Sequence, residues 1–161
     1  MNFRRGFQRI TYERNKNMKT FLAYALVIPF VQFALIFGTM LGGVIVAILS
    51  SWMPGKSGAQ LRGFIPGCVG TTIGISYGFV IFRLLVGADS FGIFPFLATI
   101  LPLSIRISNN YDVYRKFKEK EGDETDVGLK SEISIVTTGA SMMVLGELVG
   151  ILIGGCLFIS Q

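Results

Sequence analysis

The chain has 161 residues, of which 51% are hydrophobic and only 16% are charged, and its net charge is +5 at pH 7. A soluble domain of this length could not bury so much apolar surface, so the composition excludes an ordinary soluble protein. The sequence contains no histidine, which removes the commonest general base and the commonest metal ligand. We therefore expect an integral membrane protein that is not an enzyme and that uses no cofactor or metal.

The charged residues fall into two clusters that flank apolar stretches. Residues 1–19 hold six basic residues, and residues 106–132 hold six more together with seven of the ten acidic residues. Basic residues beside apolar segments are typical of anchoring at lipid headgroups. We therefore expect contact with a bilayer and none with nucleic acid.

Residues 1–19 form the first candidate unit, a basic arm. Phe3, Phe7 and Ile10 recur at helical spacing, which predicts a short amphipathic helix lying on an anionic membrane surface. A disordered basic tail is the alternative. The arginines of this arm are candidates for membrane-surface or partner contact: Arg4, Arg5, Arg9 and Arg14.

Residues 20–161 are predicted to form one domain, a bundle of four transmembrane helices. About 20 apolar residues in a helix cross a hydrocarbon core of about 30 Å, and four apolar segments approach that length. Pro29 is expected to separate the first span from an interfacial segment before it. The predicted spans are about 30–52, 63–85, 91–107 and 133–159.

Residues 108–131 are predicted to form a charged loop outside the bilayer. A short helix is expected from Tyr111 to Glu121, and Gly122 would end it. Acidic residues alternate there with Lys116, Lys118 and Lys120, which indicates a solvated surface rather than a metal site. We expect these lysines to contact the membrane surface or a soluble partner.

The segment 91–107 leaves an alternative open, because it is short and contains Pro95 and Pro102. It could form a re-entrant hairpin instead of a span, since irregular backbone at membrane depth is tolerated where protein or water covers it. With four spans, seven basic residues lie on one side of the membrane and eight on the other. With three spans, both basic clusters lie on one side.

Glycine recurs every four residues in three of the apolar segments. Residues four apart share a helix face, and glycine lets a neighbouring backbone approach closely. The stripes could pack this chain's own helices together, or they could serve self-association or contact with another membrane subunit. Three stripes are more than so small a bundle needs, which favours assembly. Their residues are Gly38 and Gly42, then Gly70, Gly74 and Gly78, then Gly146, Gly150 and Gly154.

Glu147 is the one candidate for chemistry, because it lies near the middle of the last span. An acid at this depth is costly and is a functional-site hypothesis by default. Arg83 and Arg106 are placed near the ends of their segments, so the sequence offers Glu147 no cation at its depth, and we expect it to be protonated. The polar groups expected nearest mid-depth are Thr39, Thr72, Ser76 and Tyr77.

These features predict a small polytopic membrane subunit that acts by assembly. It would form a homo-oligomer or join a larger membrane complex, and it would contact soluble partners through the basic arm and the charged loop. The alternative is a proton- or cation-conducting channel or transporter oligomer that uses Glu147. The expected location is the inner membrane of a bacterium or a mitochondrion.

Overall fold

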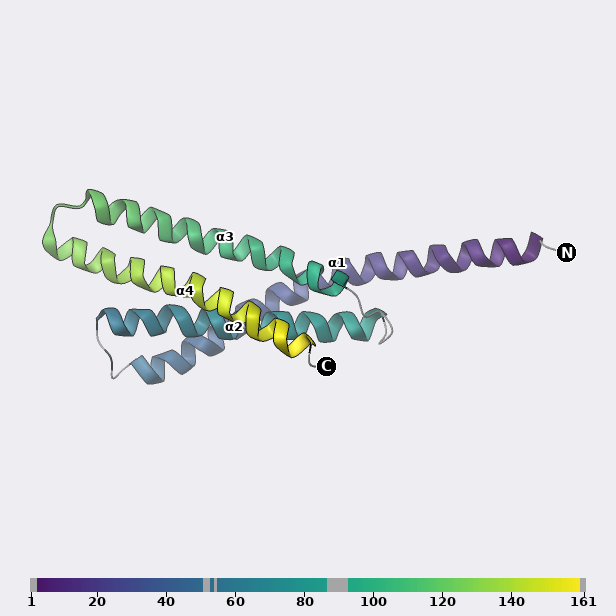
Figure 1. The fold of residues 1–161 in the computed structure, drawn as a ribbon, viewed down its shortest axis with the longest axis horizontal. Helices are drawn as coiled ribbons and strands as arrows, with labels where there is room; N and C mark the ends of the chain where they lie inside the picture. The colour runs from purple at the N-terminus through teal and green to yellow at the C-terminus, as the bar shows by residue number, and fades with distance from the viewer. Residues whose placement is uncertain (1–2, 51–52, 54, 87–92, 160–161) are drawn as a thin grey trace.

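The computed structural model describes residues 3–50, 53, 55–86 and 93–159. This described part is all-helical and holds no strand. Successive helices run antiparallel along the long axis of the molecule (Figure 1). They are α1 (Phe3–Ser50), α2 (Lys56–Val86), α3 (Ile93–Asp123) and α4 (Val127–Ile159).

Three of the helices are long and apolar enough to cross a membrane. The stretches that qualify are Phe21–Leu49 in α1, Lys56–Leu85 in α2 and Val127–Leu157 in α4. Large apolar side chains such as Phe21 (73% exposed) and Leu152 (68% exposed) point away from the protein. Apolar faces of this extent are typical of contact with lipid. The predicted helical membrane class is therefore supported, and α3 is not among the three stretches found in the described residues.

The centre of the bundle is α2, which packs against α1 on one side and α4 on another. Helix α3 packs mainly on α4 and also reaches α1. The buried apolar core lies where α1, α2 and α3 meet. It consists of Val27, Val31, Leu35, Ile75 and Leu103.

Helix α3 differs most from the sequence-based expectation. It is one continuous helix of 31 residues with Pro102 inside it, so a re-entrant hairpin at 91–107 is wrong for the described residues. The predicted loop at 108–131 is largely helix as well, because no glycine or proline interrupts the chain between Leu103 and Glu121. Gly122 lies within the last turn instead of ending a separate helix.

Helix α1 also continues where a break was expected. It runs through Pro29 without interruption, so the predicted break at Pro29 is wrong. Proline removes one backbone hydrogen bond. In an apolar environment the neighbouring backbone groups find no better partners than those of the helix, so the helix persists on both sides.

A tight turn at Glu124–Asp126 joins α3 to α4. The Asp126 carboxylate accepts hydrogen bonds from the backbone N–H groups of Gly128 (2.8 Å) and Leu129 (3.1 Å). A side chain that satisfies these free donors fixes the start of a helix. Helix α4 therefore begins at Val127, before the predicted residue 133.

The α3–α4 hairpin and the N-terminal end of α1 project from opposite ends of the bundle (Figure 1). The four-span prediction requires this arrangement, and the number of spans itself stays a prediction. The backbone of the arm is helical from Phe3. The side chains of Arg4, Arg5, Arg9 and Arg14 lie outside the described part, so the predicted amphipathic surface stays a prediction.

Candidate functional site: a buried ion pair that joins three helices

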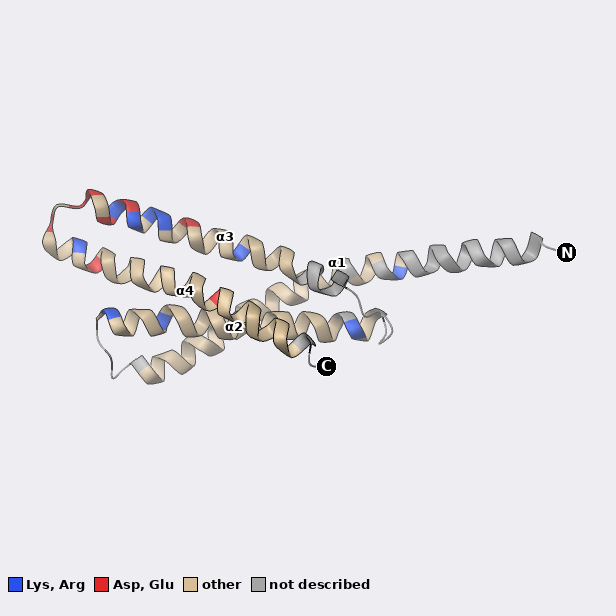
Figure 2. Ribbon diagram, in the orientation of Figure 1, with Lys and Arg blue, Asp and Glu red and all other residues tan. Residues whose placement is uncertain are grey.

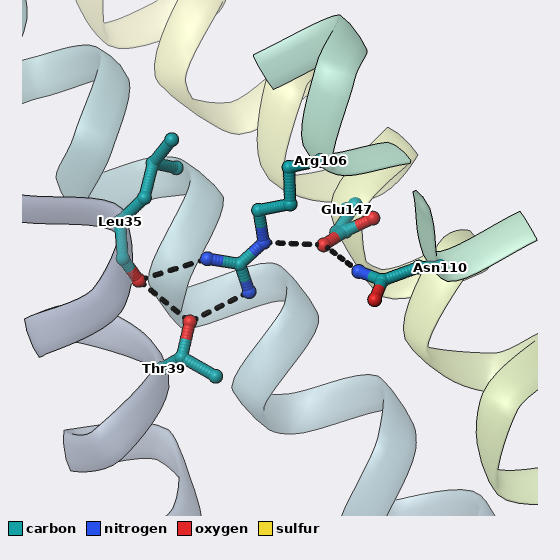
Figure 3. A network of polar contacts seen from close by, with 5 residues as sticks. All are labelled: Leu35, Thr39, Arg106, Asn110 and Glu147. Carbon is teal, nitrogen blue, oxygen red and sulfur yellow. Dashed lines mark hydrogen bonds and ion pairs between the residues drawn. The ribbon is translucent and has the colours of Figure 1, made fainter. Parts of the chain in front are cut away.

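Glu147 lies on the face of α4 that turns toward the other helices, and its side chain is completely buried. Its Oε1 atom accepts two hydrogen bonds, both from α3. Arg106 donates from Nε at 2.6 Å and Asn110 donates from Nδ2 at 2.7 Å (Figure 3). The two donors are four residues apart on α3, and this spacing places both on the same helix face.

The Arg106 guanidinium also contacts α1. One Nη donates to the backbone carbonyl of Leu35 at 3.0 Å, and the other donates to Thr39 Oγ1 at 2.6 Å (Figure 3). Thr39 Oγ1 in turn donates to the same Leu35 carbonyl at 2.6 Å. Arg106 therefore links α1 to α4 through polar contacts, and its planar fork of donors suits this role.

The ion pair lies level with the middle of the apolar stretches. Leu35 is the central residue of the stretch Phe21–Leu49, and the Arg106 side chain beside it is only 13% exposed. The premise that no cation lies at the depth of Glu147 was wrong. The contacts with a guanidinium and an amide stabilise the charged form of Glu147, whereas complete burial opposes it, so the protonated state expected from the sequence stays a prediction.

Two buried oxygen atoms in the described part have no hydrogen-bond partner in the protein: Glu147 Oε2 and Thr71 Oγ1. Thr71 lies on the face of α2 that packs against Gly150, where an added Cβ would lie 2.7 Å from its Cβ. Gly150 is about one helical turn from Glu147.

A hollow of about 350 Å³ lies between α1 and α3 beside the ion pair. It is open to the outside, and Met143 of α4 contributes to its lining. Its polar lining comes from Gln32 and Thr39 on α1 and from Arg106, Asn109 and Asn110 on α3.

The structure brings one of the four predicted hydroxyl residues into this network. Thr39 joins it, through Arg106 and not through Glu147 directly. Thr72 donates to the Gly150 carbonyl at 3.4 Å. Tyr77 is 42% exposed, and no described hydrogen bond joins Ser76 or Tyr77 to Glu147.

The sequence analysis does not include Arg106 and Asn110 among the site residues, because hydropathy predicts a span that ends at residue 107. One signal could have found them. The sequence after Leu103 contains no helix breaker until Gly122, so a single long helix would have put Arg106 near its middle.

The glycine stripes lie at contacts between helices of this same chain. An added Cβ at Gly38 would lie 2.9 Å from the Gly70 Cα, and one at Gly42 would lie 2.6 Å from the Pro66 Cα. An added Cβ at Gly74 would overlap the side chain of Leu35. Gly78 is buried. The α4 stripe faces α2: Gly146 meets Phe64, Gly150 meets Cys68 and Thr71, and Gly154 meets Ile75.

The charged end of the hairpin carries its own short-range pairs. Arg115 lies 3.5 Å from Glu119, and Lys118 lies 3.5 Å from Glu121. Lys116, Lys118 and Lys120 are all exposed. Exposed pairs of this kind contribute little to stability, so these charges remain available for contacts outside the chain.

The pKa of Glu121 offers a test of the hairpin. The hydroxyl of Ser134 on α4 donates to the Glu121 carboxylate and, with the nearby Lys118 ammonium, lowers its pKa below the ordinary value of 4.5. A depressed pKa stabilises the hairpin above pH 4.5, and this contribution is lost as the pH falls through the lowered value. Ser134→Ala is expected to raise the pKa of Glu121 toward 4.5, as measured by ¹³C chemical shift titration. A titration curve unchanged by Ser134→Ala would contradict this contact.

Compared with known proteins, the chain matches no family model, no curated protein and no solved structure.

Proposed function

We propose that the chain is a small membrane subunit that crosses the bilayer with all four helices and acts by assembly, with the α3–α4 hairpin as its contact for a soluble protein. The observation that carries this proposal is the projection of the hairpin beyond the adjoining ends of α1 and α2 (Figure 2). The part of this charged hairpin that lies beyond the ends of α1 and α2 can contact a protein outside the bundle through its exposed side chains. The proposed location remains a bacterial or mitochondrial inner membrane.

The chemistry of the hairpin end indicates the kind of partner. Residues 119–126 contain five acidic residues and one lysine. Directly after them, Val127 is 85% exposed and Leu129 is 52% exposed. Apolar side chains that follow a mainly acidic segment suit a partner whose surface combines a small apolar patch with basic residues.

The glycine stripes support assembly less than the sequence suggested. Because Gly38, Gly70 and Gly146 are covered by neighbouring helices of the same chain, these positions offer no free face to another subunit. The outward face of α1, with Phe33 (66% exposed) and Met40 (67% exposed), remains open to lipid or to another membrane helix.

Site-specific photocrosslinking in native membranes tests this proposal. A photoreactive amino acid at Val127 is expected to give a discrete adduct with a soluble protein, and charge reversal by Glu119→Lys with Asp123→Lys should abolish that adduct. The same probe at Leu152, which is exposed within the apolar stretch of α4, serves as the matched control. If Val127 gives no protein adduct beyond those formed at Leu152, the hairpin is not the contact.

The second candidate is conduction of protons or cations, and the observation that favours it is the buried Arg106–Glu147 pair beside an open hollow. Ionisable residues at membrane depth often mark ion pathways. Proton flux into vesicles should then disappear in Arg106→Met combined with Glu147→Met, a variant that leaves no unpaired charge behind. Equal flux in vesicles with this variant, the original chain or no protein would exclude conduction.

A further inference from the structure

We propose that the hollow between α1 and α3 is a hydrated vestibule, through which water and small neutral polar solutes reach the Arg106–Glu147 pair from the hairpin end of the bundle. This inference does not rest on the assembly proposed above. A subunit with such a vestibule could assemble with partners, conduct ions or do neither.

The lining of the hollow indicates its occupant. Gln32, Asn109 and Asn110 bring side-chain amides, which both donate and accept hydrogen bonds, and Thr39 adds a hydroxyl. The one cation, Arg106, is already matched by Glu147. A surface rich in donors and acceptors but without excess charge suits water and neutral polar molecules better than an ion of either sign.

The polar surface continues along α3 toward the hairpin. Asp112 and Lys116 follow Asn109 at helical spacing, and all three are exposed. In the part of α1 from Met40 to Leu49, every exposed side chain is apolar, including Val44 (59% exposed) and Ile48 (68% exposed). Lipid cannot satisfy amide or carboxylate groups, so the exposed face of this part of α3 requires water although the neighbouring face of α1 suits lipid.

The direction of access follows from the course of α1 and α3 and from the polar face of α3. Figure 1 shows that α1 and α3 separate toward Ser50 and Asp123, which are their ends on the hairpin side. The hollow lies where the two helices are still joined by Arg106. On α3 the exposed polar side chains of Asp112 and Lys116 lead from the hollow toward the hairpin, and this is the proposed direction of access.

Cysteine accessibility in lipid vesicles tests the vestibule. The two native free cysteines, Cys68 and Cys156, are first replaced by alanine, and Asn109→Cys or Val44→Cys is then introduced. Val44 is further along α1 from Thr39 than Asn109 is along α3 from Arg106, so Val44 lies closer to the membrane surface. A neutral, hydrophilic and membrane-impermeant maleimide reagent is applied to both faces by freeze–thaw, and modification is followed by mass spectrometry.

We expect Asn109→Cys to react at least about tenfold faster than Val44→Cys, because a thiol ionises to the reactive thiolate only where water reaches it. With the reagent on one face only, Asn109→Cys should react from the same face as a Val127→Cys variant at the hairpin. Reaction of Asn109→Cys from the opposite face would overturn the proposed direction of access.

The other outcomes overturn the vestibule itself. If Asn109→Cys and Val44→Cys are both inert, lipid or protein fills the hollow. If both react at similar rates, this level of the bundle lies outside the membrane. Circular dichroism and elution volume establish that the variants fold. A folded Asp112→Cys variant, one turn nearer the hairpin, replaces Asn109→Cys if the latter does not fold.

Discussion

Replacing Arg106 with methionine is expected to destabilise the folded chain by about 3–5 kcal/mol, the usual cost of removing one partner from a buried ion pair. The substitution leaves the Glu147 carboxylate with Asn110 as its remaining donor, and it removes the polar link to Leu35 and Thr39 on α1. Glu147→Met is expected to cost a similar amount, because it leaves a guanidinium beside the apolar core. Reversible unfolding in mixed detergent micelles measures both free energies.

The double variant, Arg106→Met with Glu147→Met, gives this prediction its sharpest form. Replacing both charges by apolar groups of similar size removes the uncompensated charge, so the double variant should be more stable than either single variant. Arg115→Met on the same helix is the control, since its pair with Glu119 is exposed and should be worth at most about 1 kcal/mol. If the two single losses simply add in the double variant, Arg106 and Glu147 are not paired.

The sequence was sufficient for the class of fold because long apolar stretches leave few alternatives. Stretches in α1, α2 and α4 were found from length and hydropathy alone. Their boundaries were placed too far inside the helices, since polar residues such as Lys56 and Lys130 continue a helix beyond its apolar part. Hydropathy marks the apolar part of a helix, and the end of the helix is set by capping and by helix breakers.

The position of Glu147 was predictable, but its partner was not. Helical periodicity places Glu147 on the same face as Gly150 and Gly154, and all three residues are buried. Arg106 is 41 residues away in sequence, and its depth depends on where α3 begins and how far it continues. Hydropathy counts each charge as a separate cost, so it gave no sign that the two opposite charges could stabilise each other at the same depth.

Most of the striped glycines lie against neighbouring helices of the same chain, yet the sequence could not give their partners. Periodicity defines a face of one helix and is silent about which helix covers it. The close approach of Gly146 to Phe64 and of Gly42 to Pro66 shows that α2 uses two different faces, one for each neighbour. A small bundle can therefore use three stripes internally, because its central helix makes two close contacts.

Two glycines of α4, one covered by α2 and one uncovered, provide the second prediction of large effect. An added Cβ at Gly146 would overlap the backbone carbonyl of Phe64 on α2, whereas one at Gly155 would meet nothing within 4 Å. Gly146→Ala should destabilise the chain by about 1–3 kcal/mol, because backbone atoms must move apart. Gly155→Ala should be neutral or slightly stabilising, since alanine favours the helix.

Helix α1 supplies an independent pair with the same logic. A Cβ at Gly42 would lie 2.6 Å from the Pro66 Cα, but one at the next residue, Gly43, would meet nothing within 4 Å. In detergent, Gly42→Ala should therefore lower the free energy of unfolding more than Gly43→Ala does. The same difference is expected between Gly146→Ala and Gly155→Ala. Equal losses within either pair would show that these helices do not pack as described. If instead Gly43→Ala or Gly155→Ala reduced the measured mass of the protein in micelles, an outward glycine would form a contact between copies, and assembly would involve the membrane faces as well as the hairpin.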